Sequence, residues 1–350
     1  MTQTLWAGGG VAFLMCWALV LTQRWHGRFT LDPAQGVQKF HIHPTPRVGG
    51  VGIMAGLCAV WLTAPLAWNS ILEPLMLASV PAFVFGLAED LTKSVGARAR
   101  LLATMGSGVL ASLITGTMLT HTSIPALDGA LQNWWPLALL FTAIAVGGVA
   151  NAVNIMDGFN GLASGLVIIC LCALGVIALE TSDTVLASVM FTLAAVVGGF
   201  LLVNFPLGKI FLGDGGAYVL GFWLAWLAVL LMERNPSVSP AAVLLACAYP
   251  VTEVLFSMVR RIRRSHHPMH PDRLHLHSLV KFRLARKRLG HWPTVMQNAS
   301  VSPFVWIMAS WASVLGILFW NQATAAWSGL AAFTAAYILL YRRLALFGWR

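Results

Sequence analysis

The sequence has little charge for its length. Only 10% of its 350 residues are Asp, Glu, Lys or Arg, whereas soluble domains carry about 25%. Hydrophobic residues make up 58% of the chain, and the mean hydropathy is +0.76. This composition excludes an ordinary soluble domain and is typical of an integral membrane protein.

The cysteines lack the spacing of metal ligands, and the first apolar stretch lacks the pattern of a cleavable signal peptide. The five cysteines all lie inside apolar runs, so we expect them to be buried as small hydrophobic residues. No Lys or Arg precedes the first apolar stretch, and no A-x-A site follows it. The pattern is therefore that of a membrane span and not of a signal peptide.

The apolar runs predict about eleven transmembrane helices. A span needs about 20 predominantly apolar residues. The candidate spans are 4–22, 49–68, 71–88, 101–120, 133–150, 162–180, 185–204, 215–232, 240–259, 302–320 and 323–341. We therefore expect an all-α polytopic membrane fold, with residues 1–350 as a single domain.

Basic residues lie almost entirely on one side of these spans. Of the 22 Lys and Arg residues, Arg234 alone falls on the other side. The positive-inside rule assigns the basic side to the cytoplasm, which puts the N-terminus outside and the C-terminus inside. Topology thus explains the net charge of +10, and we expect no nucleic-acid partner.

The polar clusters lie on this same side. They fall in cytoplasmic connections at about 23–48, 89–100, 151–161, 205–214 and 260–301, whereas the acidic residues on the opposite side are scattered. A passive membrane scaffold has no need of this asymmetry. We therefore expect the cytoplasmic loops to form an active site.

Two of these connections place carboxylates where a cation or phosphate could bind. Glu89-Asp90 ends the third span, where adjacent carboxylates need a compensating charge, although a solvated helix end beside Lys93 is an alternative. Asp214 lies in a glycine-rich turn, which suits a diphosphate but also an ordinary tight turn. The spacing of a nucleotide P-loop is absent.

The connection after the ninth span carries five histidines among arginines. They are His266, His267, His270, His275 and His277. Zinc is not favoured, because neither a cysteine nor H-E-x-x-H accompanies them. Histidine, neutral or charged, can bind phosphate, and Arg273 can bind it with two hydrogen bonds. A basic loop that touches anionic lipid is the alternative.

Carboxylates, carboxamides and basic groups on one face suit phosphoryl transfer. The donor would be a soluble nucleotide-linked molecule and the acceptor a lipid phosphate, with Mg²⁺ neutralising the diphosphate. A transporter is the alternative, but it predicts polar groups near the midplane and on both sides. A membrane metalloprotease lacks its ligand motif.

Five motifs, in this order, resemble the polyprenyl-phosphate N-acetylhexosamine-1-phosphate transferases of glycosyltransferase family 4. They are HIHPTPRVGG, the pair Glu89-Asp90, NAVNIMDGFNGLASG, KIFLGDGG and PDRLHLH, and they lie between about residues 41 and 280. Arg47 and the two-histidine motif resemble the branch that initiates O-antigen or common-antigen polysaccharides. They differ from the branch that makes the peptidoglycan lipid.

The resemblance implies a reaction and a location. A UDP-N-acetylhexosamine and undecaprenyl phosphate would give the undecaprenyl-diphosphate sugar and UMP, with Mg²⁺ or, alternatively, Mn²⁺ as cofactor. The enzyme would lie in the inner membrane of a bacterium, in contact with the bilayer, with its active site facing the cytoplasm. The sugar (GlcNAc, GalNAc, FucNAc or QuiNAc) and a homodimeric state stay open.

The resemblance also assigns roles by motif position. Asp214 and Asn154 would bind the metal, and Asp157 would be a catalytic carboxylate near the attacking lipid phosphate. Asp214 and the acidic pair Glu89-Asp90 complete the catalytic set. The predicted substrate-binding residues are Arg47, Lys93, Arg98, Arg100, Asn151, Asn154, Asn160, Lys209, Arg273, His275 and His277.

Three positions need a separate interpretation. Glu89 stands where the family most often has Asp. Asn160 stands where many relatives have Asp, and because its amide is neutral, we expect it to recognise uridine and not to act as a base. Glu253 lies where relatives often carry an acid, and we expect it to pair with nearby arginines.

Overall fold

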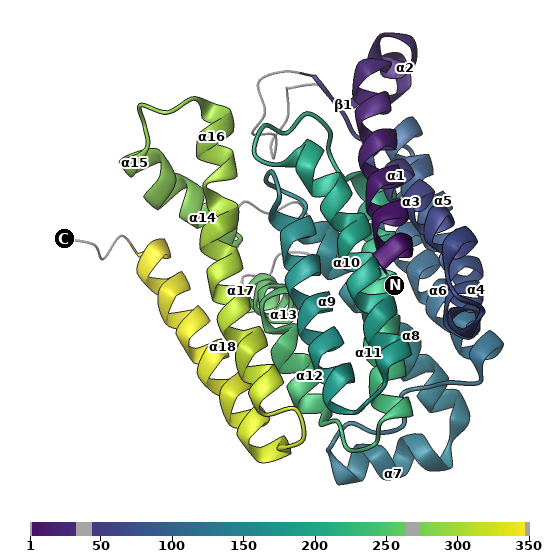
Figure 1. Ribbon diagram of the computed structural model, residues 1–350. Coiled ribbons are helices and arrows are strands. Elements are labelled where there is room, and N and C mark those ends of the chain that lie inside the picture. The colour runs from purple at the N-terminus through teal and green to yellow at the C-terminus, as the bar shows by residue number, and fades with distance from the viewer. Residues whose placement is uncertain (1, 33–43, 264–273, 347–350) are drawn as a thin grey trace.

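Long apolar runs form helices because a helix satisfies its backbone N–H and C=O groups within one segment, as lipid requires. The computed structural model describes residues 2–32, 44–263 and 274–346. Within them, seven helices are long and apolar enough to cross a membrane (Figure 1). They are α1 (Thr2–Leu21), α8 (Trp135–Met156), α9 (Leu162–Glu180), α10 (Thr184–Asn204), α11 (Gly213–Arg234), α17 (Val301–Leu318) with the preceding α16 (Thr294–Ala299), and α18 (Ala323–Ala345).

Two more segments qualify only as bent pairs of helices. The first joins η1 (Leu66–Trp68) and α4 (Asn69–Ala78) to α5 (Val80–Thr92) with a bend of 42°. The second joins α12 (Pro240–Ala246) to α13 (Ala248–Arg263) with a bend of 86°. The part of the chain that the structure describes thus has seven to nine candidate spans.

The prediction of eleven spans is therefore too high by this measure. The other two predicted spans correspond to α3 (Gly49–Thr63) and α6 (Ala97–Thr115). At 15 residues, α3 is about 22 Å long, less than the hydrocarbon thickness of about 30 Å. Charged side chains in its first turn, Arg98 and Arg100, make α6 less apolar than the other spans.

The all-α prediction is confirmed apart from one minimal strand pair. The strands β1 (Leu31–Asp32) and β2 (Thr45–Pro46) are antiparallel. The remaining helices are α2 (Gln23–Thr30), α7 (Pro125–Asn133), α14 (Leu276–Val280), the π-helical turn η2 (Lys281–Ala285) and α15 (Arg286–Arg288). In Figure 1, α2, α15 and α16 lie at one end of the bundle and α7 lies at the other.

The helix α11 is the most deeply buried of the long helices. In its most apolar stretch 89% of the residues are buried, and it packs against α8 and α5. The approach of α3 to its N-terminus requires glycine, because a Cβ on Gly50 would lie 2.3 Å from the backbone nitrogen of Gly216. This packing brings the start of α11, and with it Asp214, against neighbouring segments.

The expectation that all five cysteines are buried is only partly correct. Cys16, Cys170 and Cys247 are buried, and Cys172 is half-buried. Cys58 is exposed, on the short helix α3. An apolar run in a membrane protein can expose its small residues outward, because lipid as well as protein accepts them.

Candidate active site

Asp90 of α5 holds the N-terminus of α11. Its carboxylate is 1% exposed and accepts hydrogen bonds from the backbone N–H groups of Asp214 (2.9 Å) and Gly215 (2.8 Å). A helix N-terminus favours a negative charge, because its first N–H groups have no partners within the helix. Asp90 therefore ties α5 to the first turn of α11, which carries Asp214.

Asp214 is the point at which polar side chains from four segments meet. Arg47, just after β2, donates to its Oδ1 atom at 2.5 Å, and Asn154 of α8 donates to the same oxygen at 2.9 Å. Arg100 of α6 forms an ion pair with Oδ2. Because the Asp214 side chain is 2% exposed and those of Arg47 and Arg100 are 27% and 17% exposed, the guanidinium groups reach it from the more open side.

Arg47 and Asn154 are themselves held in place by further contacts. Arg47 Nε lies 3.3 Å from Asp90 Oδ1, so one guanidinium bridges two carboxylates. The Tyr218 hydroxyl donates to Asn154 Oδ1 at 3.3 Å, which leaves the amide nitrogen directed at Asp214. The predicted residues Arg47, Asp90, Asn154 and Asp214 therefore come together, whereas Tyr218 was not predicted.

The backbone around Arg47 explains why a side chain so distant in sequence reaches Asp214. Residues 46–50 run beside residues 211–212 and exchange backbone hydrogen bonds with them. Phe211 donates to the Pro46 carbonyl at 2.8 Å, and Gly49 and Gly50 donate back at 2.9 Å each. Backbone hydrogen bonds thus hold the motifs HIHPTPRVGG and KIFLGDGG side by side.

Asp157 follows α8 directly and lies against the same turn. Its carboxylate accepts a hydrogen bond from the backbone N–H of Gly213. Gly213 has φ +74°, a conformation that favours glycine. Burial raises the pKa of Asp157 to about 6, and Arg47 and the Gly213 N–H oppose this only in part. A carboxylate with a pKa near the working pH suits proton transfer.

Asp214 and Asn154 are the residues of this cluster that could hold a magnesium ion. In residues 2–32, 44–263 and 274–346, no three His, Cys, Asp or Glu side chains form a metal-binding group of their own. Mg²⁺ rarely needs one, because it keeps several waters and is bound through one or two carboxylates plus substrate phosphates. Asp214 supplies one carboxylate, and Asn154 beside it could add its amide oxygen after turning that oxygen from the Tyr218 hydroxyl towards Asp214.

Glu89 and Lys93 shape the turn between α5 and α6. Glu89 Oε2 accepts from the backbone N–H of Val95 at 2.8 Å. Lys93 ends α5 in the left-handed conformation and donates from Nζ to the Asp90 carbonyl at 2.8 Å. Burial lowers the pKa of Lys93, and its neighbour Arg47 lowers it further. The predicted roles of both residues towards lipid phosphate stay predictions.

Asn160 is buried and engaged with a neighbouring loop. Its side chain is turned towards residues 206–208, and its amide donates to the Pro206 carbonyl at 2.8 Å. Nearby Asn204, which was not predicted, accepts from the Gly161 N–H at 2.6 Å and donates to the Ile210 carbonyl at 2.7 Å. A buried carboxamide at the end of an apolar helix is the signal that could have revealed Asn204. Uridine recognition by Asn160 stays a prediction.

His275 and His277 lie beside the turn that follows Asp157. Their rings are stacked, with centroids 5.2 Å apart, and the His277 ring meets the Phe159 ring edge-on at 5.7 Å. Burial lowers the pKa of His277 to about 4. His277 is therefore neutral at pH 7 and offers hydrogen bonds but no positive charge.

A lysine that was not predicted also lies close to this aromatic ring. The Nζ atom of Lys281 is 5.6 Å from the centroid of the Phe159 ring. Burial lowers the pKa of Lys281 to about 8, so it is mostly charged at pH 7. Its spacing from His277 places it one turn further along the same helical segment, which sequence periodicity could have indicated.

The remaining predicted residues lie outside this set of contacts or outside the described residues. Lys209 is exposed over the ring of Trp17 in α1, at 4.9 Å, and Arg98 is exposed in the first turn of α6. Asn151 is half-buried one turn before Asn154 on α8. Arg273 falls in 264–273, outside the described residues.

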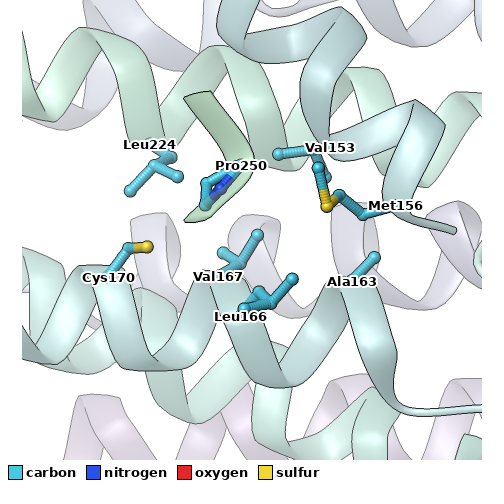
Figure 2. Close-up of a pocket in the computed structure, with 8 residues that line it drawn as sticks. All are labelled: Val153, Met156, Ala163, Leu166, Val167, Cys170, Leu224 and Pro250. Atoms are coloured by element: carbon cyan, nitrogen blue, oxygen red, sulfur yellow. The ribbon is translucent and has the colours of Figure 1, made fainter. Parts of the chain in front are cut away.

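An apolar cavity lies next to this site but differs from it in chemistry. Figure 2 shows its lining: Val153, Met156, Ala163, Leu166, Val167, Cys170, Leu224 and Pro250. These side chains come from α8, α9, α11 and α13. They offer no charged partner to a nucleotide or a diphosphate, so the candidate active site is the polar cluster around Asp214.

A polytopic membrane protein with a carboxylate- and arginine-lined site where its helices end is the class that these features define. Residues 73–232 match glycosyl transferase family 4. A probable undecaprenyl-phosphate N-acetylglucosaminyl 1-phosphate transferase of Bacillus subtilis is 27% identical over 252 residues, covering 71% of this chain and 70% of the relative. Undecaprenyl-phosphate alpha-N-acetylglucosaminyl 1-phosphate transferases of Yersinia pestis (29%) and Salmonella typhimurium (30%) each match 69% of this chain and 67% of their own length. The chain belongs to glycosyl transferase family 4 and is a distant homologue of these transferases.

Proposed function

We propose that this protein transfers an N-acetylhexosamine-1-phosphate from a UDP-sugar to undecaprenyl phosphate and releases UMP. The observation that carries the proposal is the meeting of Asp90, Asp157 and Asp214 with Arg47 and Arg100 at one place. Carboxylates that can share a divalent metal, beside guanidinium groups that can bind phosphate, suit a diphosphate substrate. The activities for which the relatives are named support the same chemistry.

In the proposed reaction, an oxygen of the lipid phosphate attacks the β-phosphorus of the UDP-sugar. The bond from that phosphorus to the bridging oxygen breaks, and the electron pair leaves with UMP. Asp157 would accept a proton from the attacking phosphate, and its pKa of about 6, close to that of a phosphate monoester, supports this role. Arg47 and Arg100 would orient the phosphates and balance their charge.

Mg²⁺ would be held by Asp214 and Asn154 and would neutralise charge on the diphosphate when bound; Mn²⁺ is the alternative. Both Asp214 oxygens face guanidinium groups, so the metal and the substrate would arrive in exchange for those contacts. Because the substrate brings phosphate to replace the carboxylate as the partner of Arg47 and Arg100, charge balance is kept throughout.

The proposed location is the inner membrane of a bacterium, with the site facing the cytoplasm. Every Lys and Arg apart from Arg234 falls on the predicted cytoplasmic side. Arg234 pairs with Asp183 at 2.8 Å, so the one exception is partly compensated. An odd number of spans, such as seven or nine, would place the two termini on opposite sides, as the charge distribution predicts.

The proposed pathway role is the initiating step of a lipid-linked cell-surface polysaccharide such as O-antigen. UDP-GlcNAc is the first donor to test, because the relatives are named for N-acetylglucosamine. UDP-GalNAc and UDP-activated FucNAc and QuiNAc complete the panel.

The test uses the full-length protein purified into lipid nanodiscs. UMP release is measured for each UDP-sugar, with and without undecaprenyl phosphate and with Mg²⁺ or EDTA. The proposal predicts UMP release for at least one sugar only when the lipid phosphate and Mg²⁺ are both present. Failure across the whole panel, or release that does not depend on the lipid phosphate, would contradict it.

A further inference from the structure

Glu253 of α13 is a fully buried carboxylate to which the proposed mechanism gives no role. Its side chain is 0% exposed. A buried charge is costly unless it is paired and hydrogen-bonded. The expected arginine partner is not found among the described residues, where Glu253 is paired instead with the imidazole of His275.

We propose that Glu253 is a positioning residue that holds His275, and through it His277, beside the Asp157–Gly158 turn. This inference depends on the proposed function for its catalytic consequence, since the two histidines would act on the nucleotide-sugar diphosphate. Its structural part concerns the hydrogen bonds of one imidazole ring and can be measured separately.

The two oxygens of Glu253 have different partners. Oε1 accepts from His275 Nδ1 at 3.0 Å, from the backbone N–H of Leu276 at 3.3 Å and from the Ser257 hydroxyl at 3.4 Å. Oε2 accepts from the Tyr249 hydroxyl at 3.2 Å. One oxygen thus faces the histidine motif, and the other faces the body of α13.

The hydrogen bonds define the tautomer of His275. An ionised carboxylate only accepts, so the proton of the His275–Glu253 bond must be on Nδ1. On the other side of the ring, the Arg261 guanidinium lies 3.4 Å from Nε2 and can only donate. His275 is therefore a neutral imidazole with its proton on Nδ1 and its lone pair on Nε2. The side chains of Ser257, Tyr249, Tyr337 and His277 also lie around this pair.

Glu253 also determines where the helix that carries His277 begins. The Leu276 N–H that donates to Oε1 belongs to the first residue of α14. The stacked rings of His275 and His277 are nearly parallel, at 5°. A Cβ on Gly158 would lie 3.7 Å from His277 Nε2. A change at Glu253 would therefore displace both rings relative to the residue that follows Asp157.

The experiment compares Glu253→Gln with Glu253→Asp and with Tyr249→Phe. The Gln side chain keeps the shape but can also donate to Nδ1, so both tautomers of His275 become accessible. By analogy with residues that orient metal-ligating histidines, we expect kcat/KM to fall by about 10- to 100-fold. Asp restores the carboxylate and should recover part of the loss. Tyr249→Phe removes a partner from the other oxygen and should stay within about threefold of the wild type.

A double-mutant cycle with His275→Gln separates positioning from a general loss of stability. If Glu253 acts through His275, adding Glu253→Gln to His275→Gln should cause little further loss. Fully multiplicative effects of the two substitutions would overturn the inference.

A measurement without turnover keeps the two proposals distinguishable. Solid-state NMR of ¹⁵N-histidine-labelled protein, with His275→Gln used to assign the His275 signals, reports the tautomer directly. We expect a protonated Nδ1 in the wild type and a mixture in Glu253→Gln. A wild-type ring protonated only on Nε2 would overturn the inference even if the enzyme were active. A wild-type protein that releases no UMP but shows the expected tautomer would reject the proposed function and support the positioning of His275 by Glu253.

Discussion

Replacing Asp214 with Asn should abolish the function of the site without unfolding the protein. The substitution keeps the size of the side chain but removes the charge that faces Arg47 and Arg100. It also sets two amide groups, those of Asn154 and the new side chain, against each other. Removing one member of a buried ion pair costs about 3–5 kcal/mol. Because the two guanidinium groups are partly exposed, we expect the free energy of unfolding to fall by about 2–3 kcal/mol here, which leaves the protein folded.

Apart from this effect on stability, the substitution removes a charge that would act on the reacting diphosphate. Removing one such electrostatic contact costs about 2.7–4 kcal/mol of transition-state stabilisation, so kcat/KM should fall at least about 100-fold. UMP release at saturating undecaprenyl phosphate over a range of UDP-sugar and Mg²⁺ concentrations measures it. The matched control is Asp128→Asn in α7, where a carboxylate also accepts hydrogen bonds, from Thr122 and His121. The control should keep wild-type activity. An Asp214→Asn variant with more than half the wild-type kcat/KM would refute the role of Asp214.

Three further substitutions or conditions test separate parts of the site. Because the pKa of Asp157 is raised from 3.8 to about 6, its carboxylate is protonated below that pH, so kcat/KM should rise about tenfold per pH unit up to about pH 6. Above about pH 6 the attacking phosphate itself loses its proton, so the rise should stop there; a flat profile from about pH 4 to 6 would exclude Asp157 as the base. Asn160→Asp removes the donor to the Pro206 carbonyl and should raise KM for the UDP-sugar; unchanged kinetics and nucleotide affinity would exclude base recognition by Asn160. Asn204→Ala breaks two buried hydrogen bonds and should lower the free energy of unfolding by about 1–3 kcal/mol for each group left without a partner, and with it the thermal midpoint and kcat; an unchanged midpoint in a thermal melt would contradict this.

The sequence predicted the parts of the site that its own motifs contain. Asp90, Asn154, Asp157 and Asp214 were predicted from motif position, and they meet in the structure. Short motifs at helix ends predict well because the ends of neighbouring spans lie in the same plane of the membrane. Arg47 joins them because its segment pairs with the backbone before Asp214.

The parts that could not be predicted depend on long-range packing. His275, the partner of Glu253, lies 22 residues further along the chain, so no local pattern signals the pair. The number of spans was overestimated, because an apolar run does not reveal that α3 stops after 15 residues. The contact of Lys281 with Phe159 joins segments more than a hundred residues apart in sequence.

The central claim is that a phosphate moves together with the sugar. UDP-N-acetylglucosamine labelled with ³²P in the β-phosphate, and with ¹⁴C in the sugar, tests this most directly in nanodiscs that contain the protein, undecaprenyl phosphate and Mg²⁺. The account predicts that both labels enter the organic-extractable lipid in equal amounts while unlabelled UMP is released. Transfer of ¹⁴C alone, with ³²P retained in released UDP, would contradict it.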